Sequence, residues 1–178
     1  MKKILLLTAL IIFSLSSAFC FILLQDWNIA TGYYIKFEGK YAEGTFDKMD
    51  GKIHFDPNDL SNSKFDVSVD VNSINTGKEL KNKHAKGDKW FDAEKYPTIH
   101  FVSSQITVAN SAYVVSGELE LHGIKKPISI PFTFENENGK AAFHGKFKVN
   151  RGDFGIGKTT GKESDSTSVE VLVPVMAQ

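Results

Sequence analysis

The feature that most constrains the fold of this chain is an alternation of apolar and polar residues that recurs in nearly every segment. It is clearest between Phe65 and Asn72, where Phe or Val occupies every second position and Asp, Ser or Asn the positions between. Successive side chains of a strand point to opposite faces, so this period predicts strands with one buried face. The segments lack the spacing of βαβ units, which predicts an antiparallel barrel or sandwich.

Turn signals divide the alternating segments into about eight or nine strands. We expect tight turns near Gly39-Lys40, at Asp50-Gly51 and at Asn138-Gly139. Asp-Gly and Asn-Gly pairs readily adopt the backbone of a two-residue hairpin turn. A loop is expected at residues 57–63, which are rich in Pro, Asn, Asp and Ser.

Two features favour a barrel over a sandwich. Most strands have a single apolar face, and glycines interrupt those faces where a barrel needs curvature or internal space. The apolar parity also changes between Phe101 and Ile106, which predicts a bulge or kink at Ser103-Ser104. We therefore predict an all-β, antiparallel, eight-stranded barrel. The interrupting glycines are Gly44, Gly117 and Gly145.

The alternation stops between Ser73 and Phe101. Residues 78–89 are almost all polar or small, and the aromatic residues Trp90, Phe91 and Tyr96 follow them. A long polar insert is unusual in a compact all-β chain and calls for a role of its own. We interpret residues 77–95 as a helical or irregular lid at one mouth of the barrel.

The first residues have the composition of a signal peptide. Lys2-Lys3 precede the uncharged run 4–24, and Ser16 with Ala18 fits cleavage after Ala18, while Ala18 with Cys20 offers a second cleavage site. Two other fates retain the segment: an uncleaved anchor, since about 20 apolar residues can span a bilayer, and a lipid-modified Cys20. Each alternative predicts an exported, periplasmic or otherwise extracytoplasmic domain.

We divide the chain into a signal segment, residues 1–20, and one domain, residues 21–178. The 21 basic and 21 acidic side chains are interspersed, so no basic surface predicts a nucleic-acid partner. Cys20, the single cysteine, lies in the apolar N-terminal segment. A disulfide, a thiolate metal site and a catalytic cysteine are therefore excluded from the domain.

Residues 152–159 match the phosphate-loop pattern G-x-x-x-x-G-K-[ST] letter for letter. That loop needs a helix after it, whose first N–H groups hold the phosphate. The residues that follow, 160–166, have no apolar period and do not predict a helix packed on a sheet. We interpret the match as a glycine-rich loop between two strands.

Candidate catalytic and metal-binding groups form no constellation. His54, His100 and His144 alternate with inward residues, so they should point outward from three strands. No serine lies on a G-x-S-x-G elbow, and the only pair to inspect is His84 with Asp88. We therefore predict no catalytic residues, no metal and no cofactor. A barrel of eight strands either is filled by its own side chains or holds one small ligand.

Eight short motifs occur in fixed order between about Trp27 and Val175. They are Gly-Thr-Phe (44–46), Ser-Ile-Asn-Thr-Gly (73–77), His84, Trp-Phe-Asp-Ala (90–93), Tyr-Pro-Thr-Ile-His-Phe (96–101), Gly-Glu-Leu (117–119), His-Gly-Ile-Lys-Lys-Pro (122–127) and Asn-Arg-Gly-Asp-Phe-Gly (150–155). In these motifs the chain resembles the YceI family of secreted, lipocalin-like proteins that bind polyisoprenoids or other long-chain lipids.

The resemblance implies a long apolar tail held inside the barrel, entering beneath or beside the insert. The chain departs from the family at Lys81-Asn82, where an Arg-Asp pair is frequent, and at Tyr33-Tyr34, where His-Ser is frequent. These departures concern contacts to a head group, whereas the apolar faces are intact. We expect the ligand-binding residues to be Phe37, Phe46, Phe65, Val67, Val69, Phe101, Phe132 and Phe147, with His84 from the insert and with Trp90 and Phe91 closing the mouth.

The partner implied by the resemblance is a long-chain isoprenoid or other lipid, and an exported lipid carrier is compatible with membrane contact. The alternative is a solid structural or interaction barrel tethered to the membrane by its N-terminus. A connected apolar void inside the barrel distinguishes the two. The sequence leaves the oligomeric state open, a homodimer included.

Overall fold

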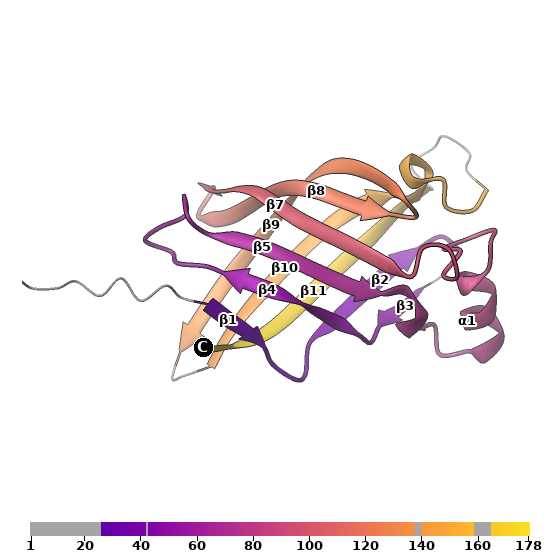
Figure 1. Cartoon of the computed structure of the whole chain (residues 1–178), viewed down its shortest axis with the longest axis horizontal. Coiled ribbons are helices and arrows are strands. Elements are labelled where there is room, and N and C mark those ends of the chain that lie inside the picture. Colours follow the sequence, from indigo (N-terminus) through magenta and orange to yellow (C-terminus); the bar gives the residue numbers. More distant parts are fainter. Residues whose placement is uncertain (1–25, 42, 138–139, 159–164) are drawn as a thin grey trace, which may run out of the picture.

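The computed structural model describes residues 26–41, 43–137, 140–158 and 165–178. Among these residues the chain forms a closed, antiparallel, eight-stranded β-barrel with one short α-helix at one end (Figure 1). The predicted fold class is therefore confirmed, and the helix lies inside the insert predicted at residues 77–95. The predicted signal segment, residues 1–20, and the predicted turn at Asn138-Gly139 lie outside the described residues.

Eleven strand segments, one α-helix and two 3-10 helices (η) make up the described chain. In chain order they are β1 (Asp26–Ile29), β2 (Tyr34–Gly39), β3 (Glu43–Phe46), β4 (Met49–His54), β5 (Lys64–Asp70), η1 (Val71–Ser73), β6 (Ile74–Asn75), α1 (Glu79–Lys86), β7 (Thr98–Ala109), β8 (Ala112–Leu121), β9 (Ile124–Glu137), β10 (Lys140–Asn150), η2 (Arg151–Phe154) and β11 (Ser166–Ala177). None of the described helices has the length and apolar character needed to cross a bilayer.

Eight strands close the barrel because three of them are interrupted and count as pairs of segments. Both β1 and β2 pair with β11, through Trp27↔Ala177 and Phe37↔Val169, so they form one strand broken at residues 30–33. Segments β3 and β4 form a second such strand, and β5 with β6 a third, interrupted by η1. Pairing of β1 and β2 with β11 closes the barrel and leaves these strands no free edge.

Two local predictions about the strands have different outcomes. The register of β7 and β8 shifts between Ser103 and Gln105, which confirms the predicted bulge. The hairpin predicted at Asp50-Gly51 is wrong, because both residues lie within β4 and pair with β5. Gly51 has φ of 149°, and a Cβ there would collide with the backbone of Asp66 and Val67. Its glycine serves the close approach of two strands and not a turn.

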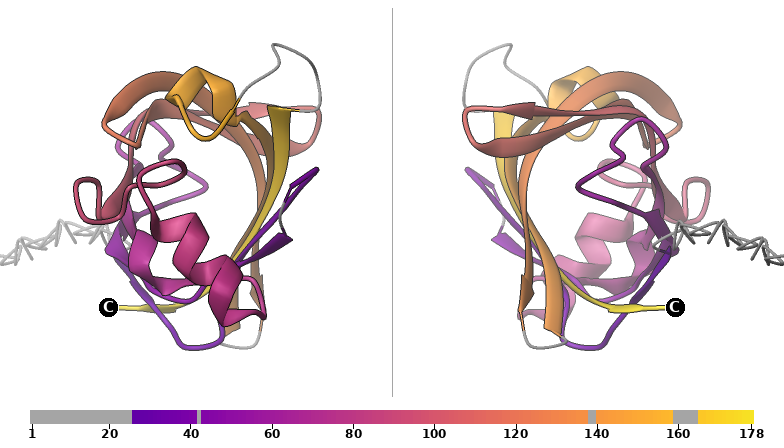
Figure 2. Two further views of the ribbon diagram at one scale, coloured as in Figure 1. Left: turned by 90° about the vertical axis from the view of Figure 1, so that its right-hand side faces the viewer. Right: turned by 90° about the vertical axis from the view of Figure 1, so that its left-hand side faces the viewer.

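The two ends of the barrel differ. At the closed end, the amide of Gln178 donates to the carbonyl oxygen of Asp26 (2.9 Å), so the first and last described residues lie together. At the opposite end, α1 lies across part of the opening, and η2 lies on the other side of it (Figure 2, left). We call this second end the mouth.

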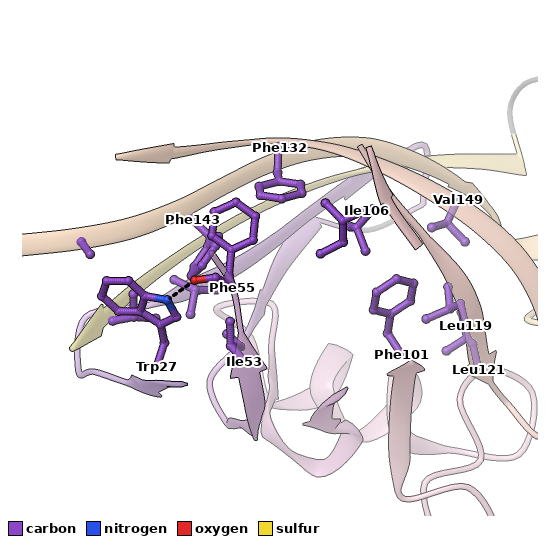
Figure 3. Close-up of a cluster of buried hydrophobic side chains, with 14 of the residues drawn as sticks. Trp27, Ile53, Phe55, Phe101, Ile106, Leu119, Leu121, Phe132, Phe143 and Val149 are labelled. Atoms are coloured by element: carbon purple, nitrogen blue, oxygen red, sulfur yellow. Dashed lines mark hydrogen bonds between the residues drawn. The ribbon is translucent and has the colours of Figure 1, made fainter. Parts of the chain in front are cut away.

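A cluster of aromatic side chains fills the closed end. Phe55 at its centre is 0% exposed, and its carbonyl oxygen accepts a hydrogen bond of 2.9 Å from the Trp27 indole N–H (Figure 3). Five other rings pack edge-on against the Phe55 ring, with centroids 5.0–6.1 Å from its own. They belong to Phe65, Tyr113, Phe132, Phe134 and Phe143. Edge-to-face contact is a favoured geometry for aromatic pairs.

Candidate functional site

A cavity of about 410 Å³ occupies the barrel between the aromatic cluster and the mouth. Phe65, Phe132 and Phe143 belong to both its lining and the cluster, so they form its floor. At the other end its lining includes the exposed side chains of Lys40, Tyr41, Lys81 and His84, so the cavity reaches the surface at the mouth. The volume lies within the range of about 300–1,000 Å³ that is usual for small-molecule sites.

The structure places all eleven residues predicted to bind a ligand on the wall of this one cavity. Phe65 and Phe132 lie at the floor, and His84, Trp90 and Phe91 come from the insert at the mouth. The remaining six occupy the wall between them: Phe37, Phe46, Val67, Val69, Phe101 and Phe147. The inward parity of the strands explains this grouping, since residues i and i+2 face the same side.

Protein side chains do not fill the interior of the barrel at the middle of the cavity. Val67, Val69, Phe147 and Val171 are only partly buried although they point into the barrel, because the cavity reaches them. Gly145 adds space at the same level, since it lines the cavity opposite Val171 in the β10–β11 register. The predicted use of this glycine for internal space therefore agrees with its position. A connected apolar void distinguishes this barrel from a solid one.

The helix α1 is attached to the mouth mainly by the residues that flank it. None of its own residues is buried, and Asn82 Oδ1 accepts hydrogen bonds of 2.7 Å from both the backbone N–H and the hydroxyl of Thr76. Phe91 packs its ring edge-on against Phe46 with centroids 5.7 Å apart. The helix therefore covers the mouth with few buried contacts, the kind of element that opens at low cost.

A buried ion pair lies beside the mouth on the side opposite α1. Arg151 donates to Asp165 Oδ1 at 2.7 Å and to the carbonyl oxygen of Ile156 at 2.8 Å, and both charged side chains are buried. The Arg151 guanidinium also lies 4.8 Å from the ring centre of Tyr41 and 5.8 Å from that of Trp90. Since Asp165 compensates its charge, Arg151 holds the two aromatic side chains in place at the rim.

The glycine-rich segment that matches the phosphate-loop pattern packs against this group. It connects β10 and β11, as predicted, with η2 before it and a strand beginning at Ser166. Gly157 has φ of 65°, and a Cβ there would lie 3.0 Å from the Trp90 ring and 3.1 Å from Arg151 Nη1. The glycine thus permits close packing at the rim.

Several residues of the site were not predicted. Ile35, Val169 and Val171 line the cavity and share the inward parity of the predicted residues, so the alternation already contained that signal. Lys40 and Tyr41 lie at the rim in a turn, Lys81 lies within α1 and Arg151 begins η2. No strand period applies there, and their position depends on which connections meet at the mouth.

The three outward histidines each face a carboxylate on a neighbouring strand. His54 lies 2.8 Å from Asp26, His100 2.7 Å from Asp66 and His144 3.1 Å from Glu170. Glu170 also accepts a hydrogen bond from the Tyr34 hydroxyl at 3.1 Å. The contacts with His144 and then Tyr34 lower the pKa of Glu170, while partial burial and the Glu170 carboxylate raise the pKa of Tyr34.

The polar groups at the mouth do not converge on one point. His84 and Asp88 form neither a hydrogen bond nor an ion pair with each other in the described structure. The described residues also contain no group of three or more His, Cys, Asp or Glu side chains that could hold a metal ion. The geometry of the site is that of an apolar pocket with a basic rim.

The family model for the YceI-like domain matches residues 27–177. The chain belongs to this family. A UPF0312 protein of Pseudomonas savastanoi pv. phaseolicola is 31% identical to it over 164 residues, which cover 80% of this chain and 85% of that protein. The match extends over the whole barrel and confirms the resemblance found in the sequence motifs.

Solved structures share the fold of this YceI-like chain. Burkholderia cenocepacia BcnA superposes with a TM-score of 0.77 at 25% identity, covering 83% of this chain and 99% of BcnA. A polyisoprenoid binding domain from Saccharophagus degradans, implicated in plant cell wall breakdown, superposes with a TM-score of 0.62 at 15% identity, covering 88% and 99% of the two chains. At that identity the second likeness concerns the fold alone.

Proposed function

We propose that this protein binds a long-chain isoprenoid or similar lipid inside the barrel, with the tail in the cavity and the head group at the mouth. The observation that carries the proposal is the connected apolar cavity, closed by aromatic rings at one end and open beside α1 at the other. Each CH₂ group buried there contributes about 0.8 kcal/mol. A tail of ~15 carbons then offers a gross term of order 10 kcal/mol before ordering costs.

The polar part of such a lipid would lie among the groups at the rim. Lys40, Lys81, His84 and Thr76 line the mouth, whereas the rest of the wall is almost entirely apolar. An apolar wall recognises a tail by its length and shape, and it provides no side chains for acid–base or nucleophilic chemistry. Binding, in the sense of sequestering or carrying the lipid, is therefore the activity that we propose, and not catalysis.

An exported location supports this role, and we include it in the proposal. Its support is the N-terminal composition, with Lys2-Lys3 before the uncharged run 4–24. The polyisoprenoid binding domain of Saccharophagus degradans adds support for the ligand class, since it has the same fold. Fractionation of cells producing the full chain would test the location, and recovery of the mature domain in the cytoplasm would contradict it.

Native mass spectrometry after gentle purification tests the binding. We expect a co-purified lipid, and uptake of a prenyl alcohol such as geranylgeraniol by the delipidated protein. Neither a bound lipid nor uptake of the probe would overturn the proposal.

A matched pair of variants tests whether the cavity is the site. Val171 lines the cavity, while its neighbour Leu172 lies on the outer face of β11. Val171→Phe fills part of the cavity, and we expect affinity for the probe to fall at least about fivefold because overpacking costs on the order of 1–3 kcal/mol. Leu172→Phe should take up the probe as the unchanged protein does. Equal uptake by both variants would place the ligand elsewhere.

A further inference from the structure

The insert at the mouth of the barrel carries more basic than acidic side chains. Residues 76–97 contain six lysines and four carboxylates, whereas the loop 56–64 at the closed end contains one lysine and two aspartates. The whole chain has a formal charge of zero, so the excess at the mouth is a local feature. A charge distribution of this kind orients a protein toward a negative surface.

The outer surface of α1 combines these charges with exposed apolar side chains. Leu80 on α1 is 67% exposed, and Tyr41, which lines the mouth of the cavity, is 46% exposed. Lys78, at the start of α1, and Lys83 are exposed as well and make no ion pair in the described structure. A single exposed leucine is unremarkable by itself. Here it lies on a basic helix at the opening of an apolar cavity.

We propose that the mouth face, defined by Tyr41, Lys78, Leu80, Lys83 and Lys89, docks on a bilayer that contains anionic lipids. The proposal rests on the proposed function, because it describes where a lipid enters the cavity. Basic side chains near a membrane surface are attracted by anionic head groups, and an adjacent leucine and tyrosine suit the interfacial region. Docking in this orientation places the opening against the bilayer, so a lipid tail moves between them with little exposure to water.

The geometry separates this contact from one made through the N-terminus. Asp26 begins β1 at the closed end, and α1 lies at the opposite end of the barrel (Figure 1). Membrane contact through the N-terminal segment would bring the closed end to the bilayer. Contact through the mouth face brings the other end there, so the two modes differ in which end of the barrel meets lipid.

Vesicle binding by the full chain tests the charge requirement. We expect it to sediment with vesicles of phosphatidylglycerol and phosphatidylcholine. Lys78→Glu with Lys83→Glu should weaken binding to the anionic vesicles by about tenfold or more, since each basic residue near a surface contributes several-fold. The control is Lys64→Glu with Lys140→Glu, which makes the same charge change at exposed positions of the closed end. Equal losses in both variants would overturn the proposal.

The two tryptophans of the chain report the orientation of the docked barrel, since one lies at each end of the barrel. Trp90 lies at the mouth, and Trp27 lies at the closed end. In the Trp27→Phe variant, we expect anionic vesicles with brominated acyl chains to quench the fluorescence of Trp90. In the Trp90→Phe variant, the same vesicles should leave Trp27 unquenched. Quenching of Trp27 without quenching of Trp90 would show docking by the closed end and would overturn the proposal.

Uptake measurements separate failure of this inference from failure of the proposed function. Lys78 and Lys83 do not line the cavity, so the variant Lys78→Glu/Lys83→Glu should still take up geranylgeraniol delivered from solution. Normal uptake by the unchanged chain, without binding to anionic vesicles, would overturn docking and leave the lipid-binding function standing. Binding to anionic vesicles without any uptake of geranylgeraniol would overturn the lipid-binding function and leave docking standing.

Discussion

The closed end and the mouth half of this barrel are built from the same strands, yet one is solid and the other hollow. At the closed end the inward side chains are large aromatic rings gathered around Phe55 (Figure 3). In the mouth half the same strands present valines such as Val67, Val69 and Val171, and a glycine at 145, between the phenylalanines of the wall. Alternation decides which side chains face inward, and their size decides whether the interior is filled.

This difference assigns stability and ligand binding to separate halves of the molecule. The aromatic cluster buries large side chains against one another, which is the main source of folding free energy in a small domain. The cavity leaves apolar surface without protein partners, which lowers stability until something covers it. The comparison predicts that equivalent substitutions have unequal effects in the two halves.

The largest contrast is expected between Phe55→Ala and Phe147→Ala. Phe55 is 0% exposed, so its truncation leaves a cavity in a packed cluster and should cost about 3–5 kcal/mol of unfolding free energy. Phe147 already faces the hollow half, and its truncation should cost on the order of 1 kcal/mol. Urea unfolding of the delipidated protein measures both. Equal losses would show that the two halves contribute equally to stability.

The next effect is expected at the rim, at the buried pair of Arg151 and Asp165. Arg151→Met leaves Asp165 buried without its arginine partner, and we expect a loss of about 3 kcal/mol. Lys48→Met is the control, because the Lys48–Asp70 pair has a separation of 3.8 Å and exposed side chains. Its loss should be below about 0.5 kcal/mol. A small loss for Arg151→Met would mean that the rim does not depend on the buried pair.

A smaller and local effect is expected for Asn82→Ala. The substitution removes both acceptor contacts to Thr76, which should destabilise the attachment of α1 by about 1 kcal/mol. Amide hydrogen exchange in α1 should become faster, while the midpoint of global unfolding changes little. Lys83→Ala, at an exposed position on the same helix, is the control. Unchanged amide exchange in the Asn82→Ala variant would show that the contacts between Asn82 and Thr76 do not hold α1 in place.

The smallest effect is expected from pH on the outer wall of the hollow half. Contacts with His144 and Tyr34 lower the pKa of Glu170, so the stability they contribute is present above the ordinary carboxyl pKa. It is lost as the pH falls through the lowered value. In an NMR titration, the pKa of Glu170 should rise toward its ordinary value in both variants, and it should rise more in His144→Ala than in Tyr34→Phe. The reverse order would show that Tyr34 is the main partner.

Much of the site could be predicted because it depends on strand parity. Once one inward residue of a strand is known, those at i+2 follow, which is why Phe65, Val67 and Val69 were found together. The bulge at Ser103-Ser104 was found for the same reason, since a bulge is the simplest way to change parity within a strand. The lid followed from the interruption of the pattern.

The parts that could not be predicted depend on contacts between distant segments. Asp50-Gly51 has the composition of a hairpin turn, but both residues lie inside β4. The glycine is required there because β5 passes too close for a side chain at position 51. The pair of Arg151 and Asp165 joins residues 14 positions apart across a loop, a separation without a sequence period. The hollow of the barrel likewise depends on which side chains meet across it.

The position of the first and last described residues at the closed end has a practical consequence. The Gln178 amide is bonded to the carbonyl of Asp26, and the mouth lies at the opposite end of the barrel (Figure 1). A purification tag, fluorescent fusion or surface linkage placed after Gln178 would therefore project away from the opening. The barrel can be immobilised on a sensor through its C-terminus with its opening facing the solution, in one uniform orientation.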